Sequence, residues 1–269
     1  MNRFEYAHPS TVDEAVRLLG KSFDEAAVLA GGTDLLSLMK DFVVEPRRLV
    51  SIAGVTGLGG IRADDAGLRI GAATTLDELV ASKEVRVRAP GVHQAAAGIR
   101  SRQMRAMGTV GGELLQRPRC WYFRRGLGLL AQDAGGSLVE RGDHRDHAVF
   151  GNAGAAKFVH ASSLAPILIA LGARATLRGP SGERSIPVAE MFRTPGREGE
   201  RESTLAPNEL LIHVDVPAGS SHDATVEIRH RRGLDWPQAA AACALTLDGD
   251  RVAEASLVLG HVAPTPWIE

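Results

Sequence analysis

Cysteine, aromatic residues and an excess of charge of either sign are all scarce in this sequence. Only two of its 269 residues are cysteines, Cys120 and Cys243, so neither a disulfide framework nor a cysteine-based metal site is expected. Aromatic residues make up 4%, so leucine, valine, isoleucine and alanine must fill the core. The formal net charge is −1, whereas nucleic-acid-binding domains usually carry a basic excess. The composition therefore argues against a disulfide-stapled protein and against a nucleic-acid partner.

Long apolar runs are absent as well. No stretch of about 18 consecutive apolar residues occurs, so no transmembrane helix is predicted. Residues 1–6 contain no apolar segment of the kind that directs secretion. Together with the few cysteines, these absences lead us to expect a cytoplasmic protein. Two arginine-rich stretches, 117–125 and 229–232, are interpreted as solvated surface, although a partner or a phosphate could use them.

Length and patterning predict about two α+β domains. Strand and helix patterns alternate early in the chain, with a buried strand at 26–30 and a short helix at 35–40. Successive strand patterns follow later, although the alanine-rich segment 238–247 fits a helix or a strand equally well. The stretch 191–207, rich in glycine, proline and charge, is expected to be a surface loop or a domain linker.

The loop after the predicted strand 26–30 is the strongest candidate for a ligand site. Gly31 and Gly32 permit positive φ angles and leave one surface of the loop bare, so that backbone N–H groups can line a concavity. The next helix adds N–H groups without acceptors, and Thr33 adds a hydroxyl. A diphosphate suits such a loop, and a side chain at Gly32 would then occupy the space of the phosphate. A simple strand-to-helix turn explains the motif equally well.

A second pair of adjacent glycines, Gly111 and Gly112, follows Thr109 in what we predict to be a tight turn. The two pairs lie about 80 residues apart in the sequence and could hold one extended ligand from both sides. A plain turn is again the simpler interpretation of this second motif.

Three other patterns fail the tests of their context. The dinucleotide-like run at 126–131 does not follow a strand, and the serine-acylase pattern at 37–40 lacks its partner motifs. His144, His147 and His160 have no carboxylate or cysteine beside them at the spacing of metal ligands. No metal site is therefore predicted.

Taken together, these residues resemble the FAD-binding medium subunit of molybdenum hydroxylases, such as xanthine dehydrogenase and carbon monoxide dehydrogenase. Each matching piece is weak, but their order and spacing over nearly the whole chain make the resemblance specific. The matching segments are 4–9, 29–35, 49–52, 57–58, 70–75, 105–112, 164–166, 171–173, 209–211 and 216–217.

The resemblance implies a two-lobed FAD-binding domain of vanillyl-alcohol-oxidase (PCMH) type, followed by a smaller C-terminal α+β domain. We place the FAD-binding domain at residues 1–178, with lobes of about 1–55 and 56–178. The C-terminal domain is placed at 179–269. Further helices would be expected beyond Glu269, so this domain is a candidate for truncation.

The resemblance also implies where FAD would bind. The first glycine loop would hold the diphosphate, the second would lie on the other side of the cofactor, and Leu211 would contact the flavin ring. In the family, electrons pass from a molybdenum subunit through iron–sulfur clusters to FAD and on to NAD, oxygen or another acceptor. The predicted FAD-binding residues are Leu29, Ala30, Gly31, Gly32, Thr33, Asp34, Leu35, Thr109, Gly111, Gly112, Ser163 and Leu211.

The stretch 115–124 resembles a narrower branch of the family, in which an inserted loop carries a 4Fe–4S cluster on four cysteines. Cys120 matches the first ligand position, Ala156 stands at the last, and no cysteine lies between them. Because one thiolate cannot hold such a cluster, we expect the loop to be present and the cluster to be absent.

Two substitutions bear on the binding of FAD. Glu113 replaces a family asparagine, and Ser163 replaces a family carboxylate that faces the ribityl chain. A glutamate that faced the diphosphate would add a like charge. Glu113 therefore turns away, or FAD sits differently, or FAD binds weakly. A family lysine near the flavin ring would fall near Glu227 or Arg229.

We interpret the chain as a flavoprotein oxidoreductase in which the cofactor carries the chemistry, because no residue is identified as a catalytic acid or base. It is either a stand-alone flavin oxidase or dehydrogenase, or an electron-transfer subunit with molybdopterin and 2Fe–2S partner subunits. The alternative is a decayed member of the family that keeps a structural or binding role without FAD. A small-molecule substrate or electron acceptor is expected, and no membrane contact.

Overall fold

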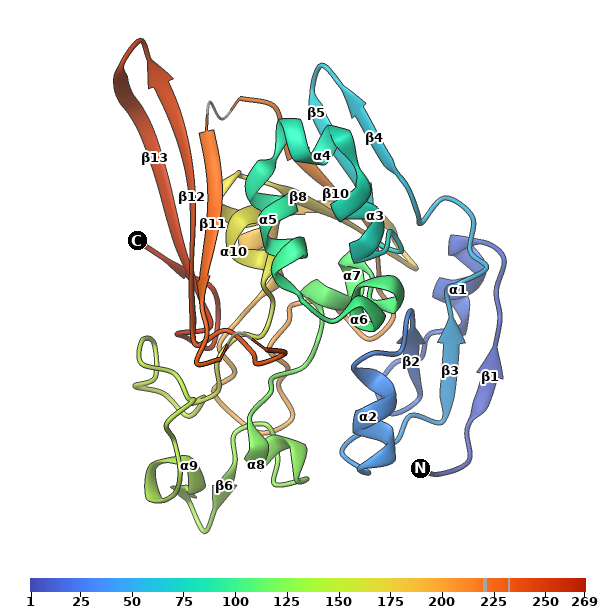
Figure 1. Ribbon diagram of the computed structural model, residues 1–269. Helices are drawn as coiled ribbons and strands as arrows, with labels where there is room; N and C mark the ends of the chain where they lie inside the picture. The colour runs from blue at the N-terminus through green and yellow to red at the C-terminus, as the bar shows by residue number, and fades with distance from the viewer. Residues whose placement is uncertain (220–221, 232) are drawn as a thin grey trace.

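Strands pair into three main sheets and one short hairpin in the part of the chain that the structure describes, residues 1–219, 222–231 and 233–269. In this computed structural model a small N-terminal sheet and a tall C-terminal sheet lie on opposite sides of a central group of helices (Figure 1). The mixture of helices and largely antiparallel sheets confirms the α+β class predicted from the sequence.

The first lobe is a parallel three-stranded sheet with two helices. Its elements are β1 (Glu5–Ala7), α1 (Val12–Leu18), β2 (Ala26–Leu29), α2 (Leu35–Lys40) and β3 (Arg48–Ser51). The strand order is β1-β3-β2. The helix α1 begins where the Thr11 hydroxyl accepts a hydrogen bond from the Glu14 N–H group at 3.2 Å, an N-cap interaction.

The central sheet is antiparallel and has the order β4-β5-β10-β8-β9. Its strands are β4 (Ile61–Asp64), β5 (Gly67–Gly71), β8 (Arg174–Gly179), β9 (Gly182–Pro187) and β10 (Leu210–Pro217). The domain boundary predicted at residue 178 does not follow this pairing, because β9 and β10 lie beyond it and belong to the same sheet. The pairing of β9 with β8 is a local hairpin, whereas β10 pairs with β5 and β8 from distant parts of the sequence, and such long-range pairing leaves no local signal.

Strand β10 is buried in two different hydrophobic cores. Leu210 and Ile212 pack in the core of the first lobe, whereas Leu211, Val214 and Val216 pack in the large core of the central sheet. Successive side chains of a strand point to opposite faces, and a bulge between Leu211 and His213 shifts the register. One strand therefore fastens the first lobe to the central sheet.

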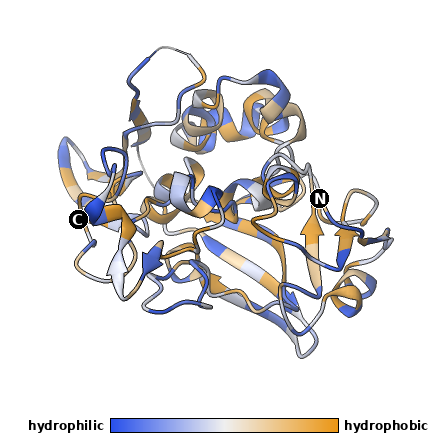
Figure 2. Ribbon diagram, turned by 90° about the horizontal axis from the view of Figure 1, so that it is seen from below, coloured by the Kyte–Doolittle hydropathy of each residue, from blue (hydrophilic) through white to orange (hydrophobic). Residues whose placement is uncertain are grey.

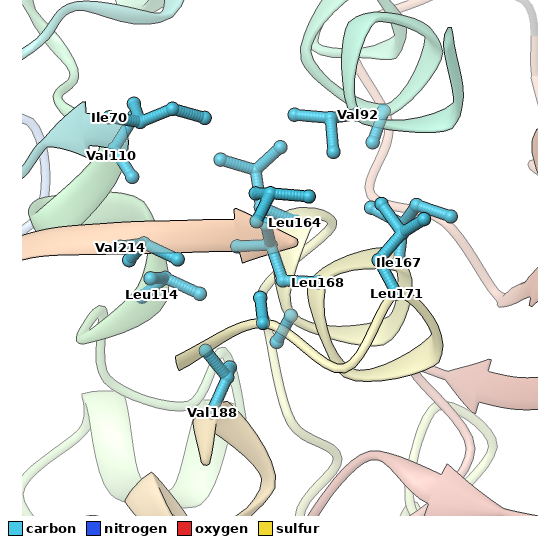
Figure 3. Packing of buried hydrophobic residues seen from close by; sticks show 14 of the residues in the cluster. Ile70, Val92, Val110, Leu114, Leu164, Ile167, Leu168, Leu171, Val188 and Val214 are labelled. Atoms are coloured by element: carbon cyan, nitrogen blue, oxygen red, sulfur yellow. The ribbon is translucent and has the colours of Figure 1, made fainter. Parts of the chain in front are cut away.

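Six helices lie beside the central sheet, and all of them except α6 contribute buried residues to the main core. They are α3 (Leu76–Ala81), α4 (Lys83–Arg88), α5 (Pro90–Gly98), α6 (Arg102–Met107), α7 (Val110–Leu114) and α10 (Leu164–Ala170). Figure 3 shows Ile70 and Val214 from the sheet converging on Val110 of α7 and on Leu164 and Leu168 of α10. Figure 2, seen from below, shows hydrophobic and hydrophilic residues along the ribbons of helices and strands, and α10 consists of apolar residues only.

The C-terminal sheet has the order β11-β12-β13-β14 and is antiparallel. Its strands are β11 (His222–Ile228), β12 (Ala239–Asp248), β13 (Arg251–Gly260) and β14 (Trp267–Ile268). The alanine-rich segment, which the sequence left open between helix and strand, is β12. Its buried residues alternate with more exposed ones, which is the two-residue period of a strand. The buried residues are Ala240, Ala242 and Ala244, and the last two belong to the main core.

An inserted stretch with short elements fills residues 115–160. It contains α8 (Trp121–Arg124), β6 (Gln132–Asp133), β7 (Gly136–Ser137) and α9 (Leu138–Arg141). Cys120, Phe123, Leu130 and Phe158 from this stretch form a small core with Leu38 of α2. The insertion is therefore packed against the first lobe, at the bottom of the view in Figure 1.

The segment 191–207 runs from the short 3-10 helix η1 (Val188–Met191) back to β10. It connects two strands of one sheet, so the interpretation as a domain linker is wrong. Met191, Phe192 and Glu202 are buried, which shows that the segment lies against the body of the protein. Across the described ranges, no helix is long and apolar enough to cross a membrane.

The two lobes approach most closely at Gly31, where a Cβ atom would overlap the carbonyl oxygen of Met107 at the end of α6. We expect Gly31→Ala to lower the free energy of unfolding by about 1–3 kcal/mol, because backbone atoms must move apart to admit the methyl group. Urea denaturation followed by circular dichroism measures this loss. The matched control is Gly59→Ala, whose Cβ has no heavy atom within 4 Å. Equal stability of the two variants would contradict the close contact between the lobes.

Candidate functional site

A cavity opens between the first lobe and the central sheet, and both predicted glycine loops line it. Its first wall is formed by residues of β2, the loop 30–34 and the start of α2. Its second wall comes from α7 and residues 115–117, and its third from the segment 201–209 and the start of β10. Three parts of the chain that are distant in sequence therefore meet around one space.

The first glycine loop exposes backbone donors to this cavity. Within the described ranges, none of the N–H groups of Gly31, Gly32, Thr33 and Asp34 donates a hydrogen bond to another backbone group. Gly32 has a φ of +71°, a left-handed conformation that glycine adopts without strain. Gly31, Gly32 and Asp34 are partly exposed and Thr33 is exposed, and all four border the cavity. Consecutive N–H groups without a backbone acceptor form a site that suits an anionic ligand.

Gly32 is required for a different reason from the one that the sequence suggests. A Cβ atom at this position would lie 2.8 Å from Cδ1 of Leu36, and not in the cavity. The space that we expected a phosphate to occupy is thus filled by a side chain of α2. A substitution at Gly32 would strain the backbone and the packing together, so it cannot separate a binding defect from a folding defect.

The second glycine pair is not a tight turn but the first turn of α7. Thr109 caps this helix, and its hydroxyl oxygen accepts a hydrogen bond from the Gly112 N–H group at 3.1 Å. The Gly111 N–H group donates to the carbonyl oxygen of Ala72 at 2.8 Å. Because these donors already have acceptors, the second pair offers a bare helical surface to the cavity rather than free N–H groups.

Asp34 joins the first loop to the inserted stretch. Its side chain, 14% exposed, accepts hydrogen bonds from the Arg117 N–H group and from Nη2 of Arg124, each at 2.8 Å, and pairs with Nη1 of Arg119 at 3.1 Å. Although Asp34 is the N-cap residue of α2, its side chain makes no capping hydrogen bond to the first turn of that helix. The side chains of these three arginines are 11–24% exposed, so the interpretation of the stretch 117–125 as solvated surface is wrong for them.

Glu113 turns away from the cavity. It is 6% exposed, is not among the lining residues, and accepts hydrogen bonds from the Ser162 hydroxyl, the Ser163 N–H group at 2.7 Å and the Leu164 N–H group at 3.3 Å. These are donors at the start of α10, so the glutamate connects α7 to α10. The negative charge of Glu113 therefore does not face the proposed diphosphate site, which is the first of the three alternatives given from the sequence.

Burial raises the pKa of Glu113 to about 7, more than its hydrogen bonds from Ser162, Ser163 and Leu164 lower it. The negative charge of nearby Glu227 raises the pKa further. The carboxyl group is therefore half protonated close to neutral pH.

Ser163 also lies outside the cavity. Its hydroxyl donates a hydrogen bond to Glu227 at 2.6 Å, and Glu227 forms an ion pair with Arg229. The side chains of Glu227 and Arg229 are 8% and 11% exposed. Arg229 is therefore not a solvated surface residue, and Arg232 of the same predicted stretch lies outside the described residues. The region where the family lysine was expected contains a closed, buried ion pair.

The structure brings together most of the predicted binding residues. Leu29 and Ser163 do not line the cavity, whereas these predicted residues do: Ala30, Gly31, Gly32, Thr33, Asp34, Leu35, Thr109, Gly111, Gly112 and Leu211. The cavity is also lined by Phe23, Asp24 and Arg201, which were not predicted from the sequence. They come from a connection and from the supposed linker, and no local motif identifies them.

The inserted stretch places Cys120 beside a histidine that the sequence left without a partner. The Sγ atom of Cys120 lies 3.1 Å from Nε2 of His147, and both residues are buried. Burial raises the pKa of the thiol and lowers the pKa of the imidazole, which favours a neutral pair. Ala156 is fully buried. Within the described residues, no three His, Cys, Asp or Glu side chains form a group that could hold a metal ion.

Comparisons with known proteins bear on this geometry. The sequence profile of a family described as "FAD binding domain in molybdopterin dehydrogenase" matches residues 2–219. The aldehyde oxidoreductase FAD-binding subunit PaoB of Escherichia coli is 34% identical over 275 residues, covering 99% of this chain and 84% of that protein. The carbon monoxide dehydrogenase medium chain of Hydrogenophaga pseudoflava is 30% identical, covering 98% and 76%.

A solved structure agrees with these sequence matches. Carbon monoxide dehydrogenase from Hydrogenophaga pseudoflava, in a form that lacks the Mo-pyranopterin moiety of its cofactor, superimposes with a TM-score of 0.74 at 29% identity. The match covers 99% of this chain and 77% of the other. The overall fold of the chain thus has a counterpart in that enzyme.

The raised pKa of Glu113 predicts a pH dependence of stability. The folded protein holds this proton more tightly than the unfolded chain, so the contribution of Glu113 to stability falls as the pH rises from about 4.5 to about 7. We expect the wild type to lose stability relative to Glu113→Gln over this range, with a limiting slope of about 1.4 kcal/mol per pH unit. Urea unfolding of both proteins between pH 5 and 8 measures the difference. A constant difference over this range would refute the assignment.

Proposed function

The chain belongs to the family of FAD-binding domains in molybdopterin dehydrogenases, and on this premise we propose that it binds FAD in the cavity between its lobes. We further propose that it serves as the electron-transferring flavin subunit of a molybdenum hydroxylase. The observation that carries the first proposal is the run of free N–H groups at residues 31–34 beside that cavity.

The residues around the cavity fit a dinucleotide. The bare loop 31–34 offers donors to a diphosphate, and Thr33 adds a hydroxyl beside them. Apolar side chains, among them Leu38, Ile52 and Leu211, line the rest of the space and suit the flat rings at either end of FAD. The surface of α7 at Gly112 has no side chain, so a ligand can approach its backbone closely.

When bound, the flavin supplies the redox chemistry that amino-acid side chains cannot perform. The chain itself binds and orients the cofactor. The first loop offers N–H donors to the negatively charged diphosphate, and Leu211, which is 3% exposed, presents an apolar surface to the cavity. In this proposal no side chain of the cavity acts as a general acid or base.

Membership in a complex is favoured over a stand-alone enzyme. The relatives carry names of subunits: an FAD-binding subunit of an aldehyde oxidoreductase, medium chains of carbon monoxide dehydrogenases, and subunit alpha of a 6-hydroxypseudooxynicotine dehydrogenase complex. We therefore infer partner subunits that carry molybdopterin and 2Fe–2S clusters. The alternative of a decayed member without FAD is disfavoured, because Glu113 faces α10 and leaves the cavity free of its charge.

We also infer that the inserted stretch carries no 4Fe–4S cluster. Cys120 is the only cysteine between residues 115 and 160, and its thiol is engaged with His147. The small core around Phe123, Leu130 and Phe158 occupies the interior of the insertion and stabilises it without a metal.

Gly112 offers a test of FAD binding that leaves the fold intact. A Cβ atom at this position would meet only the Thr109 hydroxyl, at 3.2 Å, so a longer side chain would extend towards the cavity. We expect Gly112→Leu to weaken FAD binding by roughly 10- to 100-fold, because a bulky group in a filled site costs about 1–3 kcal/mol.

Titration of the flavin-free protein, followed by flavin fluorescence, measures this loss, and thermal melting without flavin checks the fold. The control is Gly112→Ala, which we expect to bind within a few-fold of the wild type. If the leucine variant bound FAD as tightly as the wild type, the cavity would not be the flavin site.

Iron analysis tests the absence of the cluster. We expect protein purified without oxygen from iron-supplied cells to contain far less than four iron atoms per chain, and Cys120→Ser to leave this content unchanged. The physical reason is that a single thiolate cannot replace the four that such a cluster needs. Near-stoichiometric iron that disappears in Cys120→Ser would overturn the inference.

A further inference from the structure

Five charged side chains line the cavity, and most of them are neutralised within the protein. They are Asp24, Asp34, Arg117, Arg201 and Glu209. Asp34 pairs with arginines of the inserted stretch, Arg117 pairs with Glu202, and Glu209 pairs with Arg184 at 2.6 Å. Three of the five charges are therefore engaged before any ligand arrives.

Arg201 is the cation that stays unpaired among these residues. In the described part of the chain, its guanidinium has no hydrogen-bond acceptor and no carboxylate within ion-pair distance, and its contact is with the ring of Phe23. The centre of the guanidinium lies 3.9 Å from the ring centroid. Asp24 is close enough to favour the charged form but makes no ion pair with it.

The contact with Phe23 holds the guanidinium at the junction of the lobes. Phe23 belongs to the first lobe, between α1 and β2, whereas Arg201 belongs to the segment that leads into β10. A cation over an aromatic face is stabilised without using its N–H donors in the ring plane. The donors of Arg201 are therefore fixed in position and available.

The surroundings of Arg201 are poorly solvated. Burial lowers the pKa of Arg201 to about 10, and the positive charge of Arg117 contributes in the same direction. The side chain is still protonated at neutral pH. Arg201 is partly exposed, so water solvates part of its charge, and a phosphate in the cavity would replace that water with a direct ion pair.

We propose that the guanidinium of Arg201 pairs with a phosphate oxygen of the bound dinucleotide. This inference rests on the proposed binding of FAD. It assigns to the segment 201–209 a direct role in ligand recognition. Guanidinium groups suit this role because their planar donors match phosphate oxygens in pairs.

Three variants test the charge separately from the shape. Arg201→Met keeps an apolar stem against Phe23 and removes the charge, whereas Arg201→Lys keeps the charge. The matched control is Arg197→Met. It removes a charge from an 82% exposed side chain that lies in the segment 191–207 and outside the cavity lining. Dissociation constants for FAD are measured by titration of the flavin-free proteins, and thermal melting without FAD checks their folding.

We expect Arg201→Met to weaken FAD binding by roughly 10- to 100-fold, the typical loss of a hydrogen bond to a charged group. Arg201→Lys should recover most of this loss, and Arg197→Met should bind within about twofold of the wild type. Equal binding by all three variants, or equal weakening by the Met and Lys variants, would overturn the role of the charge. A wild-type protein that binds no FAD would instead refute the proposed function itself.

Discussion

The double burial of β10 is the constraint on which the rest of the structure depends. Leu210 and Ile212 complete the core of the first lobe, while Leu211, Val214 and Val216 complete the core of the central sheet. Because one strand serves both cores, the lobes cannot move apart without exposing apolar surface on one side of it. The cavity lies where β10 begins, so its walls are set by the same packing.

Polar groups around the cavity follow a second constraint, that a buried charge must find a partner. Asp34 meets this requirement with arginines of the inserted stretch, and Glu113 meets it at the start of α10. Both carboxylates thereby become parts of the framework that holds the cavity open. The first glycine loop and Arg201 differ from them, because their donors remain free and face the space between the lobes. The first glycine loop and Arg201 therefore give the cavity its unpaired hydrogen-bond donors, because Asp34, Arg117 and Glu209 are already paired within the protein.

The inserted stretch is held in place by apolar packing and by polar contacts. Phe123, Leu130 and Phe158 bury their side chains together with Leu38 of α2. Cys120 and His147 contact each other within the same region. Apolar packing and the link from Arg124 to Asp34 hold this stretch against the first lobe. In the absence of further cysteines, these contacts are sufficient to account for its ordered position beside the cavity.

The sequence by itself determined the local elements and the first glycine loop, because alternation and glycine pairs act between near neighbours. The strand 26–29 and Gly31 are examples. It also predicted ten of the lining residues through a resemblance carried by ordered motifs. Only the tertiary structure decided that β10 pairs with β5 and β8, that Glu113 faces α10, and that Phe23 and Arg201 meet at the cavity. These features depend on contacts between residues far apart in the chain, and such contacts leave no periodic or local signature in the sequence.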